Sequence, residues 1–145
     1  MPAPWAYFDT SVFVKRYVRE PGSARARALL RRYRFLTSAI TPVEAISAVC
    51  RRRAAGELTA RSFAAILSRL RRDRAYWELV EVSPLVLNEA EALIQRTAVR
   101  TLDALHLASA LVFQSASGDQ VPLITADSRQ RDAARRLALE VVWAG

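Results

Sequence analysis

Four acidic residues occupy similar places in this sequence, each after a short apolar run or in the first turn of a helical pattern. Their contexts read FDTSV, TPVEA, RTLDALHLA and ITADS. Carboxylates held close together repel by roughly 4 kcal/mol per pair at an effective dielectric constant of about 20, so a fold that gathers them needs a cation. Mg²⁺ prefers such oxygen ligands and can activate a water against a phosphodiester. The sequence therefore indicates metal-dependent phosphate chemistry at Asp9, Glu44, Asp103 and Asp127.

Each of these acids also has a purely structural explanation. Asp9 and Asp127 have the residue type and position of helix N-caps. The segment 41–44, TPVE, fits a capping box that would place Glu44 at the third helical position. Asp103 would favour the positive end of its helix. The interpretation of the four acids as one metal site depends on whether the strands bring them to the same edge of the sheet.

The elements that must position the acids alternate between strand and helix. Short apolar runs are separated by stretches with helical periodicity, which predicts a parallel sheet with helices on both faces. Ligands bind such sheets beyond the carboxyl ends of the strands, where Asp9 and Asp127 are expected. We expect one α/β domain over residues 1–145, with strands near 5–8, 35–38, 79–82, 123–126 and 141–142.

Three further side chains stand beside the acids. His106 lies one turn beyond Asp103, where it would orient that carboxylate, contact substrate, or simply pack as a hydrogen-bonded histidine. The hydroxyls of Ser11 and Thr125 are candidates to support the acids, with capping or turn roles as the alternative.

Composition favours a polyanionic partner. The chain has 145 residues, a net charge of +8 and a pI near 10.9, which makes nucleic acid the first candidate. The N-terminal segment lacks a basic region followed by a long apolar stretch, and no segment is apolar enough to span a bilayer. We therefore expect a cytoplasmic protein without membrane contact. Cys50, the only cysteine, is expected to be reduced and buried on a helix face with Val43 and Ile46.

Arginines crowd two consecutive helical stretches. One set lies at 51–53 and the other at 69–74, and each is either a contact for RNA phosphates or a solvated helical face. The helical pair over 41–77 is alternatively a surface for homodimer formation.

These motifs resemble the PIN-domain ribonucleases, and among them the VapC-like toxins of toxin–antitoxin pairs. The similarity is carried by YFDTSVFVKRYVREPGS at 7–23, TSAITPVEAISAVCRRRAAGEL at 37–58, RTLDALHLASAL at 100–111 and LITADSRQRDAA at 123–134. The resemblance implies an α/β/α sandwich with a mainly parallel sheet. It also implies Mg²⁺ or Mn²⁺ held by the acids, with Asp9 and Asp103 the most direct ligands and Glu44 and Asp127 bound directly or through water.

The same resemblance implies an endoribonuclease toxin that cleaves RNA and is silenced by a cognate antitoxin. The chain departs from the pattern at Gln130, where an apolar residue is expected. Three alternatives stay open: a non-catalytic nucleic-acid-binding or antitoxin-binding module, a metal-dependent DNA nuclease, and a phosphotransferase with Asp9 as nucleophile. The last would normally have a second aspartate where Ser11 stands, or a late lysine, and Lys15 is the only lysine.

Overall fold

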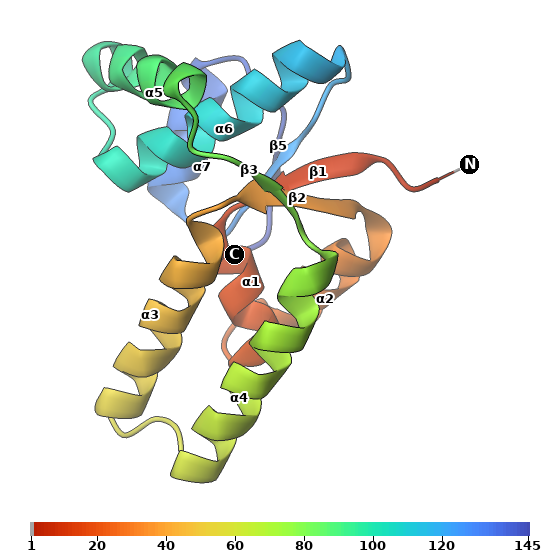
Figure 1. Ribbon diagram of the computed structural model, residues 1–145, viewed down its shortest axis with the longest axis vertical. Coiled ribbons are helices and arrows are strands. Elements are labelled where there is room, and N and C mark those ends of the chain that lie inside the picture. The colour runs from red at the N-terminus through yellow and green to blue at the C-terminus, as the bar shows by residue number, and fades with distance from the viewer. Residues whose placement is uncertain (1) are drawn as a thin grey trace.

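A computed structural model describes residues 2–145 as a five-stranded sheet covered by helices (Figure 1). The strands are β1 (Trp5–Phe8), β2 (Arg34–Ser38), β3 (Glu78–Val80), β4 (Leu123–Thr125) and β5 (Val141–Trp143). The helices are α1 (Thr10–Tyr17), α2 (Ser23–Arg32), α3 (Thr41–Ala54), α4 (Ala60–Asp73), α5 (Pro84–Thr97), α6 (Thr101–Ser117) and α7 (Ser128–Arg136), with a 3₁₀ turn at Arg74–Tyr76.

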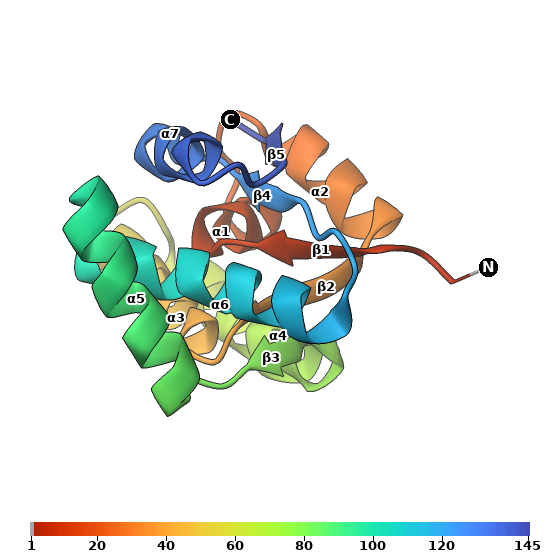
Figure 2. The same ribbon diagram turned by 90° about the horizontal axis from the view of Figure 1, so that it is seen from above.

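All neighbouring strands pair in parallel, in the order β3-β2-β1-β4-β5. Figure 2 shows β1 between β2 and β4. The chain builds outward from β1 to β3, then returns to the other side of β1 to add β4 and β5. The topological switch point therefore lies between β1 and β4, and Asp9 and Asp127 follow these two strands.

Two apolar cores fill the spaces on either side of the sheet. Ala6 and Phe8 face the core covered by α1 to α4, whereas Tyr7 faces the core covered by α5 to α7. This alternation follows from the two-residue period of a strand. The predicted three-layer α/β/α architecture is confirmed (Figure 1). Within residues 2–145, no helix has the length and apolar character needed to cross a bilayer.

The prediction for Cys50 is wrong. Cys50 is exposed, as are Val43 and Ile46, whose exposed fractions are 70% and 38%. Helix α3 runs outward with α4 beyond the sheet (Figure 1), so only one of its sides is covered. That side carries Ala45 and Val49, whereas Val43, Ile46 and Cys50 lie on the exposed side of α3.

Gln130 occupies a buried position, which explains why an apolar residue is expected there. Its side chain is 1% exposed, and its Nε2 donates to the backbone carbonyl of Asp103 at 3.3 Å. Its Oε1 has no hydrogen-bond partner within residues 2–145. The amide thus links α7 to the first turn of α6, and one buried acceptor stays unsatisfied.

We predict that Gln130→Leu will leave the free energy of unfolding unchanged or raise it by about 1 kcal/mol, because it removes a buried unsatisfied acceptor. Gln114→Leu is the matched control. Gln114 Oε1 accepts from the backbone N–H of buried Val121 at 3.0 Å, so its loss should cost about 1 kcal/mol or more. Denaturant unfolding measures both. A larger loss for Gln130→Leu than for Gln114→Leu would contradict the prediction.

Candidate active site

Asp9 lies where β1 ends and α1 begins. Its backbone is extended, and its Oδ1 accepts from the Ser11 N–H at 2.9 Å, which makes it the N-cap of α1. The Ser11 hydroxyl also donates to Oδ1, and the Thr125 hydroxyl donates to Oδ2. The side chain is buried, with 5% exposed. The cap expected from the sequence is therefore present, and the same carboxylate faces the neighbouring strand end.

The hydroxyls of Ser11 and Thr125 also fasten the two strand ends together. The Ala126 N–H donates to the Ser11 Oγ at 3.1 Å, and the Asp127 N–H donates to the Thr125 Oγ1 at 3.0 Å. Each hydroxyl thus accepts from the loop after β4 and donates to Asp9. This arrangement fixes Asp9 and Asp127 on either side of the switch point.

Burial raises the pKa of Asp9, and the negative charge of Asp127 adds to the rise. The positive influence of His106 and the hydroxyl donors Ser11 and Thr125 oppose it without cancelling it. The ionised form of Asp9 is thus disfavoured in the metal-free fold. A cation beside it would reverse that balance.

Asp127 is the N-cap of α7, as expected. Its Oδ1 accepts from the Arg129 N–H at 2.9 Å, and the Arg129 Nε lies 3.7 Å from the same oxygen. The cap uses one carboxylate oxygen. The other oxygen stays available to a cation in the cleft.

Asp103 lies in the first turn of α6 without capping it. Burial raises the pKa of its carboxyl, and the charges of Asp127 and Glu44 raise it further, whereas Arg129 and His106 lower it. No hydrogen bond contributes to this balance among the described residues. The protein therefore leaves the ionised form of Asp103 disfavoured, as it does that of Asp9.

Glu44 does not form the capping box that the sequence suggests. Helix α3 begins at Thr41 after an Ile40 N-cap that makes no side-chain cap, and the Thr41 hydroxyl instead bonds the Thr37 hydroxyl at 2.7 Å. The Oε1 of Glu44 accepts from the Thr10 hydroxyl at 2.8 Å and meets the His106 Nε2 at 2.6 Å. The tertiary contact with α6 replaces the local one.

His106 therefore bonds Glu44, not Asp103 as its position one turn along the helix suggests. Its Nδ1 lies 2.8 Å from the Tyr7 hydroxyl. Burial raises the pKa of Glu44, but the hydrogen bond and charge of His106, with smaller effects from Thr10 and Arg51, outweigh it and leave the pKa lowered. The ionised form of Glu44 is thus stabilised, in contrast to Asp9 and Asp103.

Tyr7 and Thr10 are the contacts that sequence reasoning missed. Tyr7 carries a hydroxyl inside an otherwise apolar strand and is fully buried, and such a hydroxyl needs a partner. This requirement of a buried tyrosine hydroxyl is the sequence signal that could have pointed to Tyr7. Nothing in the sequence identified His106, 99 positions away, as the partner.

A cleft of about 690 Å³ opens beside Glu44 and Asp127, with Thr10 and Ser11 in its wall. Its basic lining comes from the first arginine cluster, since Arg51 and Arg52 both contribute, and from Lys15 and Arg129. Residues 69–74 are not part of this lining.

The basic residues of this cleft differ in their own partners. Lys15 lies 3.1 Å from Glu20, and Arg52 pairs with both Glu20 and Glu57. Arg51 donates to the Ser47 hydroxyl at 2.8 Å. Because Arg51 has no acidic partner within 4.0 Å among residues 2–145, its charge is less neutralised than that of Arg52.

The donor set suits a hard divalent cation, although no three Asp, Glu, His or Cys side chains of residues 2–145 converge into a ready metal-binding group. Carboxylate and hydroxyl oxygens are the ligands that Mg²⁺ and Mn²⁺ prefer. The raised pKa values of Asp9 and Asp103, to which Asp127 contributes in both cases, show a repulsion that such an ion would relieve.

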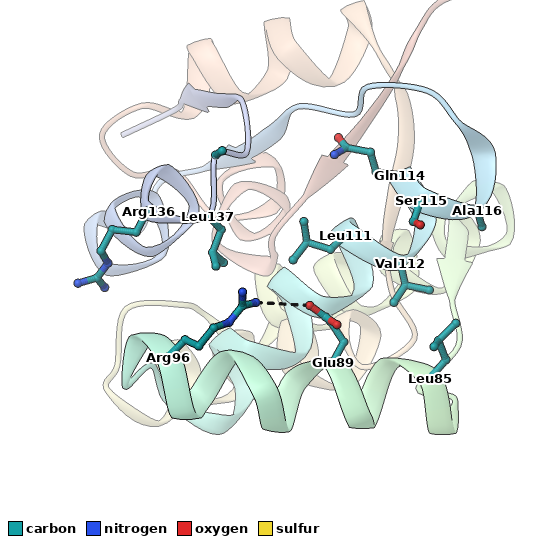
Figure 3. Close-up of a pocket in the computed structure, with 11 residues that line it drawn as sticks. Leu85, Glu89, Arg96, Leu111, Val112, Gln114, Ser115, Ala116, Arg136 and Leu137 are labelled. Carbon is teal, nitrogen blue, oxygen red and sulfur yellow. Dashed lines mark ion pairs between the residues drawn. The ribbon is translucent and has the colours of Figure 1, made fainter.

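A second cleft, of about 860 Å³, lies between α5, α6 and the end of α7 (Figure 3). Leu85, Leu111 and Val112 contribute to its apolar lining. Its one ion pair among the residues drawn joins Glu89 to Arg96 at 3.7 Å. None of the four sequence-predicted acids lines it, so it is not the candidate active site.

Comparison with known proteins agrees with this geometry. A family model described as PIN domain matches residues 6–136. The chain belongs to the PIN-domain family. Ribonuclease VapC46 of Mycobacterium tuberculosis is 38% identical over 137 residues, which cover 94% of this chain and 95% of that protein.

Solved structures share the PIN-domain fold at lower identity. A toxin–antitoxin complex from Klebsiella pneumoniae matches with a TM-score of 0.70 and 18% identity, covering 97% of this chain and 98% of the other. VapBC-5 from Mycobacterium tuberculosis, a member of the VapBC family of toxin–antitoxin systems, matches with a TM-score of 0.65 and 22% identity, covering 98% and 99%.

The opposite pKa shifts in this PIN domain predict opposite effects on stability. Asp103→Asn should raise the melting temperature of the metal-free protein at neutral pH, because it removes a disfavoured charge. Since a raised carboxyl pKa costs stability only above the unfolded value of about 3.9, this gain should shrink as the pH falls toward that value. Calorimetry from pH 3 to 8 measures the gain.

Glu44→Gln should lower the melting temperature under the same conditions. The lowered pKa of Glu44 contributes stability above the unfolded value of about 4.3, which is lost as the pH falls through the folded pKa. Changes of melting temperature with the same sign for Asp103→Asn and Glu44→Gln at neutral pH would contradict this electrostatic explanation.

Proposed function

We propose that this protein is a divalent-metal-dependent endoribonuclease and the toxin of a toxin–antitoxin pair. Its VapC-type PIN-domain membership makes it a hydrolase of the nuclease type. The observation that carries the proposal is that burial and the charge of Asp127 raise the pKa of both Asp9 and Asp103, while Asp127 and Glu44 themselves line a basic cleft at the switch point. The relative that is named a ribonuclease supports RNA as the substrate of this chemistry.

Each acid has a role in the proposed centre. Asp9 and Asp103 are the direct ligands of Mg²⁺ or Mn²⁺, because both carry charges that the protein leaves disfavoured. Asp127 and Glu44 act directly or through water. When bound, the ion supplies an activated water and stabilises the leaving oxygen of the phosphodiester.

The protein's other groups hold the acids and the substrate. Ser11 and Thr125 keep Asp9 oriented by donating to its two oxygens. Arg51 and Arg129 line or flank the same cleft, where a guanidinium fits a phosphate oxygen pair. The net charge of +8 attracts RNA over longer distances.

Among the alternatives, a phosphotransferase with Asp9 as nucleophile fits the geometry poorly. Asp9 is only 5% exposed, and Ser11 stands where such an enzyme would normally carry a second aspartate. DNA cleavage and non-catalytic binding are distinguished from RNA cleavage by the assay below.

The proposed partner is an antitoxin that closes the cleft. Exposed apolar side chains on α3, Val43 at 70% and Ile46 at 38%, offer surface for a segment that folds on binding. A basic side chain of that segment would relieve the repulsion of the acids as a metal does. A homodimer through the helical pair α3 and α4 stays a prediction, which light scattering tests. The expected compartment is the cytoplasm.

We predict that the purified protein cleaves RNA with Mg²⁺ or Mn²⁺, and that EDTA abolishes cleavage. Asp9→Asn and Asp103→Asn should each reduce the rate by about 100-fold or more, exceeding the roughly 10–100-fold typical of partners outside the metal's own ligands. Gel assays on RNA and on single-stranded and double-stranded DNA measure this.

The matched control is Asp132→Asn, which neutralises an exposed acid within α7 that pairs with Arg131 at 3.0 Å. Asp132 should be dispensable, and circular dichroism confirms folding of each variant. Full activity of a folded Asp103→Asn protein would remove Asp103 from the ligands. Cleavage of DNA in preference to RNA would favour the DNA nuclease instead.

A second prediction concerns the cell. Expression of this chain alone should arrest growth of a bacterial host, co-expression with its antitoxin should restore growth, and Asp9→Ala should be harmless. Colony counts after induction measure the effect. If soluble wild-type protein is harmless in a host without the antitoxin, the toxin role is wrong even where the purified nuclease is active.

A further inference from the structure

A line of buried hydrogen bonds runs from the centre of the sheet to the wall of the cleft. The Tyr7 hydroxyl lies 2.8 Å from His106 Nδ1, and His106 Nε2 lies 2.6 Å from Glu44 Oε1. Tyr7 is 0% exposed and His106 is 3% exposed, whereas Glu44 reaches the cleft. The line therefore joins a strand, α6 and α3 through side chains alone.

The chemistry of the groups sets the direction of each bond. An ionised carboxylate only accepts, so His106 Nε2 must donate to Glu44. When the ring is neutral, Nδ1 accepts from the Tyr7 hydroxyl; when the ring is cationic, the form whose charge lowers the pKa of Glu44, Nε2 still donates to Glu44. Burial raises the pKa of the Tyr7 phenol well above its usual range, so that the hydroxyl remains a donor.

We propose that Tyr7 and His106 are positioning residues for the metal centre: Tyr7 holds His106 in its Nε2–H form, and His106 holds the Oε1 of Glu44. This inference rests on the proposed function. Both donors, His106 and Thr10, bind Oε1 of Glu44. Its Oε2 accepts no hydrogen bond within residues 2–145, so Oε2 is the oxygen available to a metal ion in the cleft.

The Thr10 hydroxyl strengthens this arrangement by donating to the same Oε1 at 2.8 Å. Thr10 follows Asp9 directly, so the beginning of α1 holds both acids. Two donors on one oxygen fix the carboxylate's rotation more firmly than either alone, and charge-assisted hydrogen bonds are short and directional. Partners of this kind typically change metal affinity by about 10–100-fold when removed.

The chain contains one histidine, which makes the tautomer directly observable. The ¹⁵N imidazole spectrum of the metal-free protein, at a pH where the ring is neutral, should show the Nε2–H form. Tyr7→Phe should shift the spectrum toward a tautomer mixture, and Glu44→Gln should move the Nε2 signal. A wild-type spectrum of the Nδ1–H form would overturn the proposal without any metal or RNA.

Mn²⁺ affinity, measured by titration calorimetry, supplies the second readout. Tyr7→Phe and His106→Ala should each weaken binding by about 10–100-fold. His106→Gln should recover part of the loss, because its amide N–H can replace the ring Nε2–H. In a Glu44→Gln background, Tyr7→Phe should cause no further loss, since Tyr7 acts only through Glu44.

Tyr17→Phe is the matched control. The Tyr17 hydroxyl donates to Asp73 Oδ2 at 2.6 Å, its side chain is 6% exposed, and it lies in the opposite core. This variant should lose stability and keep its Mn²⁺ affinity. Two outcomes would show that Tyr7 and His106 have only a packing role. One is an equal loss of Mn²⁺ affinity in Tyr17→Phe, and the other is a full further loss when Tyr7→Phe is added to Glu44→Gln.

The two proposals fail in distinguishable ways. A wild-type protein that binds Mn²⁺ and cleaves RNA, with Tyr7→Phe unchanged in affinity, overturns the positioning role alone. A wild-type protein that binds no Mn²⁺ overturns the metal-dependent function and the role of Tyr7 and His106 in it. The tautomer spectrum then still reports whether the hydrogen-bonded line exists.

Discussion

Repulsion between carboxylates at one edge of the sheet is the constraint on which the rest of the site depends. Asp9 and Asp127 must lie close because β1 and β4 are paired neighbours, and α6 brings Asp103 into the same field. Burial raises the pKa of Asp9 and Asp103, so the metal-free fold holds charge that it does not fully stabilise. A cation bound there, as the proposed function requires, would stabilise these charges.

The protein stabilises the charge of Glu44, in contrast to those of Asp9 and Asp103. His106 and Thr10 donate to it, and its pKa is lowered where those of Asp9 and Asp103 are raised. One acid of the cluster is therefore held ionised by the protein, whereas two others depend on a cation. In the proposed metal centre, such a division would combine a fixed geometry at Glu44 with charges at Asp9 and Asp103 that a cation neutralises.

Arginine supplies the counter-charge without filling the site. Arg52 is neutralised by Glu20 and Glu57, while Arg51 lines the cleft and Arg129 stands beside Asp127. The arginines of 69–74 lie away from this cleft, and Arg69 stacks on Tyr17 with 5.2 Å to the ring centroid. Arg51 is thus the residue of the first cluster that the proposed function assigns to phosphate, and Arg69 in the second has a packing role.

The sequence by itself determined the parallel α/β architecture and the caps at Asp9 and Asp127, because these follow from local periodicity and local capping chemistry. The predictions for Cys50 and for the capping box at Glu44 were wrong. Which side of α3 is covered, and the hydrogen bond of His106 to Glu44, both depend on elements distant in sequence. Only the tertiary structure decided the contacts of Tyr7 and Gln130. A buried polar group must find a partner, but the chain fold chooses which one.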